Sequence, residues 1–173
     1  MVVNIHSREY RAALDEVGAL IDGLSSQGDR LWPYERWGPM FFDRPLEVGA
    51  VGGHGGGTIG YVIEKYEPGR YIRFRFTNPA GFIGTHCFDV EETSPEMVRL
   101  RHTIRMELMG ESKKSWPLAI RWLHDALIED AFDKAAATLQ GQPVVYREQS
   151  WWVKFLLKQV RRKREKAEPG KKH

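Results

Sequence analysis

Two histidines, His86 and His102, have the residue type and spacing best suited to chemistry in this sequence. Both stand in segments where apolar and polar residues alternate, and both fall on the apolar side of that alternation. A hairpin centred on Ser94 would place position 86 directly opposite position 102. Burial and mutual repulsion would keep both imidazoles neutral at pH 7. Such a pair could orient a ligand carbonyl or phenol, act as acid and base, or serve only as a hydrogen-bonded core pair.

Three further polar residues are expected beside the apolar core. His124 and Asp130 belong to a helical segment and lie close to its apolar stripe. An acid in that place can anchor a ligand hydroxyl, or it can pair with Arg30 or Arg36. Tyr61 is expected to face inward, where its hydroxyl needs a partner. A ligand-binding role and a structural role are both open for these residues.

Several kinds of site are not expected. The glycine run 52–57 lacks the Lys-Ser/Thr pair of a phosphate loop and precedes a strand pattern, so it indicates a hairpin or cavity rim. No two of the histidines at 54, 86, 102 and 124 have the i, i+4 spacing of a helical metal motif. The sequence has no Gly-x-Ser-x-Gly, and Cys87 falls on the polar side of its strand, so no nucleophile is identified. We therefore expect no metal and no cofactor.

An antiparallel meander is predicted to position the two central histidines. Apolar residues alternate with period two between 48 and 109, and turn-forming residues interrupt the alternation three times. A weaker strand is expected near 46–52. The four main segments are 58–66, 71–77, 82–91 and 97–109.

Helices are predicted on both sides of this meander. Residues 2–6 form a short strand, after which Ser7 caps an amphipathic helix. Prolines and aromatic residues between 25 and 47 favour a short helix or loop packed over an opening in the fold. The segment 115–140 has the longest helical pattern, and 150–167 forms a second amphipathic helix.

This order of elements resembles the helix-grip fold of the START-like superfamily, also called the polyketide-cyclase or SRPBCC superfamily. The resemblance covers about residues 1–140. It implies an α+β domain in which a curved antiparallel sheet of about six strands wraps around a long helix and encloses a deep apolar cavity. We expect this domain at 1–141 and a C-terminal extension at 142–173. The strings that support the resemblance are Asp29-Arg30-Leu31-Trp32-Pro33, Gly84-Thr85-His86-Cys87-Phe88, Arg101-His102-Thr103 and Leu123-His124-Asp125-Ala126-Leu127-Ile128-Glu129-Asp130.

The side chains expected around the cavity follow from strand parity and the helical stripe. Missing side-chain volume at Gly60, Gly84 and the glycine run, near one end of the sheet, is expected to leave a pocket instead of a solid core. The predicted cavity residues are Tyr61, Phe74, Phe76, His86, Phe88, His102, Ile104, Ile120, His124, Leu127 and Asp130. The predicted mouth residues are Trp32, Trp37, Phe41 and His54.

The C-terminal extension carries the positive charge of the chain. The 173 residues have a net charge of +3 and a pI of about 9.0, but residues 151–173 hold nine Lys and Arg against two acids. Nucleic-acid binding is therefore not expected of the domain. The apolar side of the last helix must be covered by the domain, a second copy of the chain, or an anionic membrane surface. The residues expected at that contact are Trp151, Trp152, Phe155, Lys158, Arg161 and Arg162.

The sequence predicts a cytoplasmic protein, with peripheral membrane association as an option. It shows no signal peptide and no run of about 18 apolar residues, and its single cysteine cannot form an internal disulfide. The predicted function is binding or carriage of a hydrophobic or aromatic small molecule, such as a lipid or polyketide-like compound. One alternative is a cyclase/aromatase or dehydratase with His86 and His102 as acid–base groups. Another is a membrane-associated interaction protein.

Overall fold

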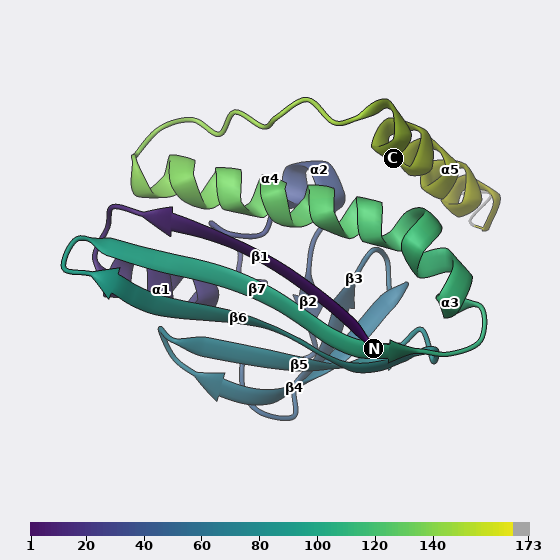
Figure 1. Cartoon of the computed structure of the whole chain (residues 1–173), viewed down its shortest axis with the longest axis horizontal. Helices are drawn as coiled ribbons and strands as arrows, with labels where there is room; N and C mark the ends of the chain where they lie inside the picture. Colours follow the sequence, from purple (N-terminus) through teal and green to yellow (C-terminus); the bar gives the residue numbers. More distant parts are fainter. Residues whose placement is uncertain (168–173) are drawn as a thin grey trace.

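A seven-stranded antiparallel sheet forms the body of the protein, in the order β1-β7-β6-β5-β4-β3-β2. The computed structural model describes residues 1–167, with side chains described through Arg162. The sheet curves beneath one long helix, as Figure 1 shows. Its strands are β1 (Val2–Tyr10), β2 (Phe41–Phe42), β3 (Val51–His54), β4 (Ile59–Glu67), β5 (Tyr71–Asn78), β6 (Phe82–Ser94) and β7 (Met97–Leu108).

The helices cover the concave face and the ends of this sheet (Figure 1). The long helix α4 crosses the concave face, and α5 follows it after an irregular segment. This is the predicted helix-grip architecture, with one strand more than expected. The helical elements are α1 (Leu14–Asp22), α2 (Tyr34–Trp37), α3 (Ser112–Ser115), the π-helical turn η1 (Trp116–Ile120), α4 (Arg121–Leu139) and α5 (Trp151–Ala167).

The core lies between the sheet and α4, on the face that strand parity predicted. Phe74 and Leu100 are fully buried from the sheet side, and Phe132 and Ala135 are fully buried from α4. The helix α1 contacts β6 and β7 and closes one end of this core with Leu20 and its neighbours. Burial of large apolar side chains on both sides supplies the main force that holds the helix on the sheet.

The predicted helix start at Ser7 was wrong. Strand β1 continues to Tyr10 because it pairs with β7 over its whole length, from Val2 opposite Met106 to Tyr10 opposite Val98. The nine-residue ladder outweighs the local capping preference of Ser7. Helix α1 begins later, and Glu16 accepts a hydrogen bond from the backbone N–H of Ala13 at its start.

The two short strands β2 and β3 differ from what the sequence predicted for residues 25–54. The proline-rich segment was expected to hold a helix or loop, and it holds both α2 and β2. The weak strand expected near 46–52 is β3, displaced to Val51–His54. Strand β2 pairs with β3 through Phe41 opposite Gly53, which adds the seventh strand at the sheet edge. Pro39 and Pro45 flank this two-residue strand outside the paired positions, where proline does not interrupt the ladder.

The helix predicted at 115–140 is not uniform. It starts with α3, widens into the π-helical turn η1 that contains Pro117, and continues as α4. Pro117 has no amide hydrogen to donate to an α-helical ladder, which accounts for an irregular turn at that place. Trp116 in this turn is buried and packs edge-on against Phe82 of β6.

Gly84 does not act as a source of empty volume, contrary to the prediction. A Cβ atom at this position would collide with the backbone of Arg105 and Met106 on β7. Gly60 is similar, because a Cβ atom there would lie 2.9 Å from Oγ1 of Thr77. Both glycines therefore permit close approach of neighbouring strands.

Candidate functional site

A cavity of about 330 Å³ lies between the sheet, α4 and the two helices α2 and α5, which confirms the predicted cavity. Its lining is mainly aromatic and aliphatic, with histidine and arginine side chains among the apolar ones. The lining residues are Trp32, Arg36, Trp37, Gly38, His54, Gly55, Thr58, Ile59, Phe76, Phe82, His86, Phe88, His102, Ile104, Trp116, Ile120, Leu123, His124, Leu127, Ile128, Leu157, Val160 and Arg161.

Four of the predicted site residues do not line the cavity. Tyr61 and Phe74 are fully buried behind it, where both rings contact the ring of His86. Asp130 is buried and bonds to other protein groups, and Phe41 lies half-exposed on the edge strand β2. The other predicted cavity and mouth residues all contribute to the lining.

The helix α5 closes part of the cavity. The sequence left open which surface this helix covers. Val153 and Leu156 are buried, and Leu157, Val160 and Arg161 contribute to the lining. The amphipathic pattern predicts that this helix covers something, but it does not say what. Among the described residues, no helix is long and apolar enough to cross a membrane.

His86 and His102 meet diagonally rather than directly, so the predicted pairing was wrong. His86 stands opposite Ile104, and His102 stands opposite Phe88. The hairpin turns at Pro95 and Glu96, where Ser94 stands opposite Met97, and not at Ser94 as predicted. A register irregularity between Glu92 and Ser94 follows, and beyond it the pairing differs from the predicted one by two residues. The rings still touch, because diagonal neighbours on one face of an antiparallel pair lie within reach. His86 Nδ1 is 3.3 Å from His102 Nε2.

Burial makes both imidazoles neutral. His86 is 6% exposed and His102 is 2% exposed. Desolvation, together with the nearby histidines, lowers the pKa of each far below the ordinary value of 6.5. In a neutral imidazole, one nitrogen donates a hydrogen bond and the other accepts one.

The contact between these rings determines what they can offer to a ligand. It uses one nitrogen of each ring, so one ring donates and the other accepts. The two remaining nitrogens, Nε2 of His86 and Nδ1 of His102, must then be of opposite kinds, one N–H donor and one lone-pair acceptor. Both are buried, and neither has a hydrogen-bond partner among the described residues.

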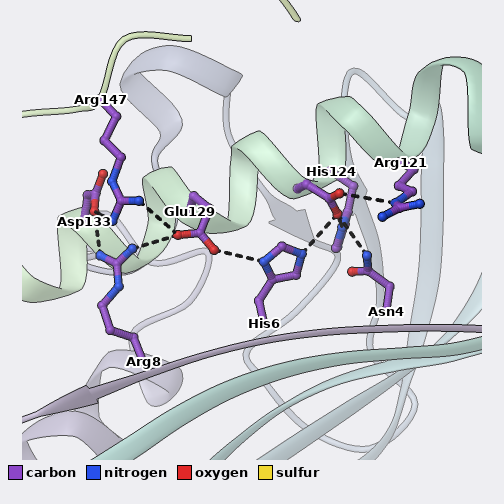
Figure 2. Close-up of polar contacts among 9 residues, drawn as sticks. Asn4, His6, Arg8, Arg121, His124, Glu129, Asp133 and Arg147 are labelled. Atoms are coloured by element: carbon purple, nitrogen blue, oxygen red, sulfur yellow. Dashed lines mark hydrogen bonds and ion pairs between the residues drawn. The ribbon is translucent and has the colours of Figure 1, made fainter. Parts of the chain in front are cut away.

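A polar seam joins β1 to α4, as Figure 2 shows. Alternate residues of the strand meet every fourth residue of the helix. The periods match because two strand residues rise about 6.6 Å and four helix residues rise about 6.0 Å. The contacts are Asn4–Asp125 at 2.9 Å, His6–Asp125 at 3.0 Å, His6–Glu129 at 2.9 Å, Arg8–Glu129 at 2.8 Å and Arg8–Asp133 at 2.5 Å.

Asp125 is the centre of this seam. Burial would raise its pKa, but hydrogen bonds from His124, His6 and Asn4 hold the pKa of this carboxyl far below its usual range. Burial also acts against the charged form of His6, yet its bonds to Asp125 and Glu129 raise its pKa above 6.5. His124 connects the seam to the cavity, because it lines the cavity and its Nδ1 lies 3.5 Å from Asp125 Oδ1.

The seam was not predicted from the sequence. The signal was present, because Asn4, His6 and Arg8 alternate along the strand while Asp125, Glu129 and Asp133 recur at four-residue spacing. Each pattern by itself is typical of a solvent-exposed face. Only the packing of α4 across β1 turns the two faces toward each other.

The comparisons with known proteins concern the fold. Neither a protein-family model nor a curated protein sequence matches this chain. A solution structure from Thermobifida fusca is similar, with a TM-score of 0.64 and 13% identity over 86% of this chain and 99% of that chain. Norcoclaurine synthase from Thalictrum flavum, solved with dopamine and hydroxybenzaldehyde, has a TM-score of 0.60 and 15% identity over 82% of this chain and 88% of that chain. XoxI from Bacillus cereus has a TM-score of 0.58 and 20% identity over 81% of this chain and 96% of that chain.

These similarities place the chain among helix-grip proteins. They agree with the fold that the resemblance stated from the sequence implied. At such low identity, the similarity establishes the fold alone and assigns no activity.

Proposed function

We propose that this protein binds a small apolar or aromatic molecule that carries a hydroxyl or carbonyl group, and that it acts as a binding or carrier protein. The observation that supports this most strongly is the pair of unpartnered imidazole nitrogens, His86 Nε2 and His102 Nδ1. A buried polar atom without a partner costs about 1–3 kcal/mol. A ligand oxygen that hydrogen-bonds to one of these nitrogens would recover part of that cost, whereas a pure hydrocarbon would not.

The size and walls of the cavity agree with this ligand class. A volume of about 330 Å³ is at the lower end of the range for small-molecule sites. Rings such as Phe76 and Phe88 in the lining suit an aromatic ligand. The structurally similar norcoclaurine synthase was solved with dopamine and hydroxybenzaldehyde, which are small aromatic molecules. Arg36 and Arg161 add positive charge to the lining.

A matched pair of probes tests the proposal. We expect the protein to bind 2-naphthol more tightly than 2-methylnaphthalene, by about two- to tenfold, since one buried hydrogen bond contributes about 0.5–1.5 kcal/mol. In His102→Phe this preference should disappear, while in Ile120→Val it should remain. Fluorescence titration measures the affinities, and native mass spectrometry of the purified protein identifies any retained ligand. Equal affinity for both probes in the original chain would contradict the proposed recognition.

A second candidate function is acid–base catalysis in the same cavity, of the cyclase/aromatase or dehydratase kind. The coupled histidine pair favours it, because one free nitrogen can take a proton while the other gives one, with the shared proton moving between the rings. In a dehydration, the base would remove the proton α to a carbonyl and the acid would protonate the departing β-hydroxyl. Release of water from a β-hydroxy ketone, followed by ultraviolet absorption in the original chain and in His86→Phe, tests this candidate.

Contact of α5 with an anionic membrane is a third candidate, and dimer formation through the same surface is its alternative. Trp151 is 77% exposed and Phe155 is 45% exposed, beside the exposed cations Lys154 and Lys158. Aromatic side chains next to cations are typical of helices that lie at a membrane surface. Sedimentation with phosphatidylserine vesicles should be weakened by salt and by Lys158→Glu. Sedimentation velocity without vesicles tests the dimer.

A further inference from the structure

We propose that His6, His124 and Asp125 form a binding site for a divalent transition-metal ion of the zinc class, in the wall between the polar seam and the cavity. Each of the three residues offers one ligand atom, and these atoms lie within 4.8 Å of one another. From the contacts to Asp125 Oδ1, the nitrogens would be His6 Nε2 and His124 Nδ1. This inference is independent of the proposed ligand function, because it uses neither His86 nor His102.

The distances between the ligand atoms suit such an ion. Metal–ligand bonds of about 2.0–2.2 Å place neighbouring ligand atoms about 3.0–3.5 Å apart. His6 Nε2 lies 3.0 Å from Asp125 Oδ1, and His124 Nδ1 lies 3.5 Å from the same oxygen. The side chains come from β1 and α4, two packed elements, so the set is largely in place before an ion binds (Figure 2).

The surrounding residues support a metal site as well. Glu129 Oε1 accepts from His6 Nδ1 at 2.9 Å, which leaves Nε2 as the nitrogen for the metal. In zinc sites, the ring nitrogen of a histidine that does not bind the metal usually donates a hydrogen bond to a carboxylate or another acceptor. Glu129 is itself held by Arg8 at 2.8 Å. The amide oxygen of Asn4, next to Asp125, is buried and lacks a partner among the described residues, and it is a further oxygen donor.

The site can form without breaking the seam. In the metal-free protein, a proton on His6 Nε2 serves the bond to Asp125. The ion would take the place of that proton, while the bond from Nδ1 to Glu129 stays. Two imidazoles and one carboxylate leave coordination positions open, and His124 lines the cavity. A polar group of a molecule in the cavity could then complete the coordination.

No metal site was expected from the sequence, because no two of the histidines at 54, 86, 102 and 124 are one helical turn apart. His6 was not among those candidate ligands. The set proposed here combines a strand residue with two adjacent helix residues, which only the packing of β1 against α4 brings together.

Cobalt and zinc binding by the full, untagged chain test the inference. After removal of metal with a chelator, we expect Co²⁺ to give a visible d–d absorption that saturates at one ion per chain. Zn²⁺ should abolish this absorption by displacement and should raise the melting temperature. Asp125→Asn should reduce the Co²⁺ affinity at least a hundredfold. Glu129→Gln should reduce it about ten- to a hundredfold, as loss of an outer carboxylate does.

Asp133→Asn is the matched control, because it makes the same Asp-to-Asn change about two turns further along α4, outside the proposed ligand set. It should bind Co²⁺ like the original chain. His124→Gln replaces Asp125→Asn if the latter does not fold, as judged by circular dichroism. Absence of Co²⁺ absorption in the original chain, or equal affinity in the ligand variants and the control, would overturn the proposal. Either result leaves the naphthol experiment unaffected, so failure of the two proposals can be told apart.

Discussion

The carboxylate of Asp130 accepts a hydrogen bond from the indole nitrogen of Trp37 at 2.7 Å, and this contact ties the short helix α2 to the long helix α4. Arg36 lies 3.2 Å from the same carboxylate, and the Gln149 side chain reaches it at 3.4 Å. One buried acid therefore anchors two elements that border the cavity and the segment that leads into α5. Asp130 acts here as a structural anchor beside the cavity.

Loss of this anchor should destabilise the protein and loosen the cavity. Asp130→Ala removes the acceptor of the half-buried Trp37 indole N–H and the partner of Arg36, so we expect the free energy of unfolding to fall by about 1–3 kcal/mol. Asp130→Asn keeps an oxygen for Trp37 and should lose less. Urea denaturation measures both variants. A stability of Asp130→Ala equal to that of the original chain would contradict the anchoring role.

Acid should weaken the fold through the buried histidines. Burial lowers the pKa of His86 in the folded state below the 6.5 of the unfolded chain. The unfolded state therefore binds more protons below about pH 6.5, and the stability present above that pH is lost as the pH falls, by at most about 1.4 kcal/mol per pH unit for one histidine. His86→Phe should show a flatter dependence than the original chain between pH 7.5 and 5. Parallel curves would contradict this, because they would mean that His86 binds a proton as readily in the folded protein as in the unfolded chain.

The attachment of α5 should depend on its inner side chains. Leu156 is buried, whereas its neighbour Phe155 is 45% exposed. Leu156→Ala should therefore release α5 and increase amide hydrogen exchange in that helix, with little change in the exchange of α4. Phe155→Ala is the matched control and should leave exchange in α5 close to that of the original chain. Equal protection of α5 in both variants would mean that Leu156 does not hold the helix.

Close approach of β6 and β7 should make Gly84 intolerant of a side chain. Gly84→Ala would drive a methyl group into the backbone of Arg105, so we expect a loss of about 1–3 kcal/mol, as for other overpacked sites. Gly28→Ala has open space around the new methyl group and should change stability by less than about 0.5 kcal/mol. Thermal denaturation of the two variants compares them. Similar melting temperatures would show that the strands can separate at no cost.

Periodicity along the sequence was sufficient for the fold class. Alternation over the meander predicted the inward face of β5 to β7, and the structure buries Ile72, Phe74 and Leu100 as expected. The extent of β1 was not predictable in the same way, because Ser7 carries a capping preference that strand pairing with β7 overrides. Local preference and long-range pairing compete at that position, and only the second depends on the partner strand.

The candidate site was predictable only in part. Parity was enough to place His86 and His102 on one buried face, because a shift of two residues leaves the side of a strand unchanged. The diagonal contact between the two rings depends on the strand register near Ser94, where the pairing is irregular. No residue pattern in the sequence predicted this irregularity. The inward face of α5 and the joining of His6 to Asp125 were decided by tertiary packing, because each requires two surfaces far apart in the chain to meet. Residue spacing determines which side chains share a face, and the packed structure determines what that face contacts.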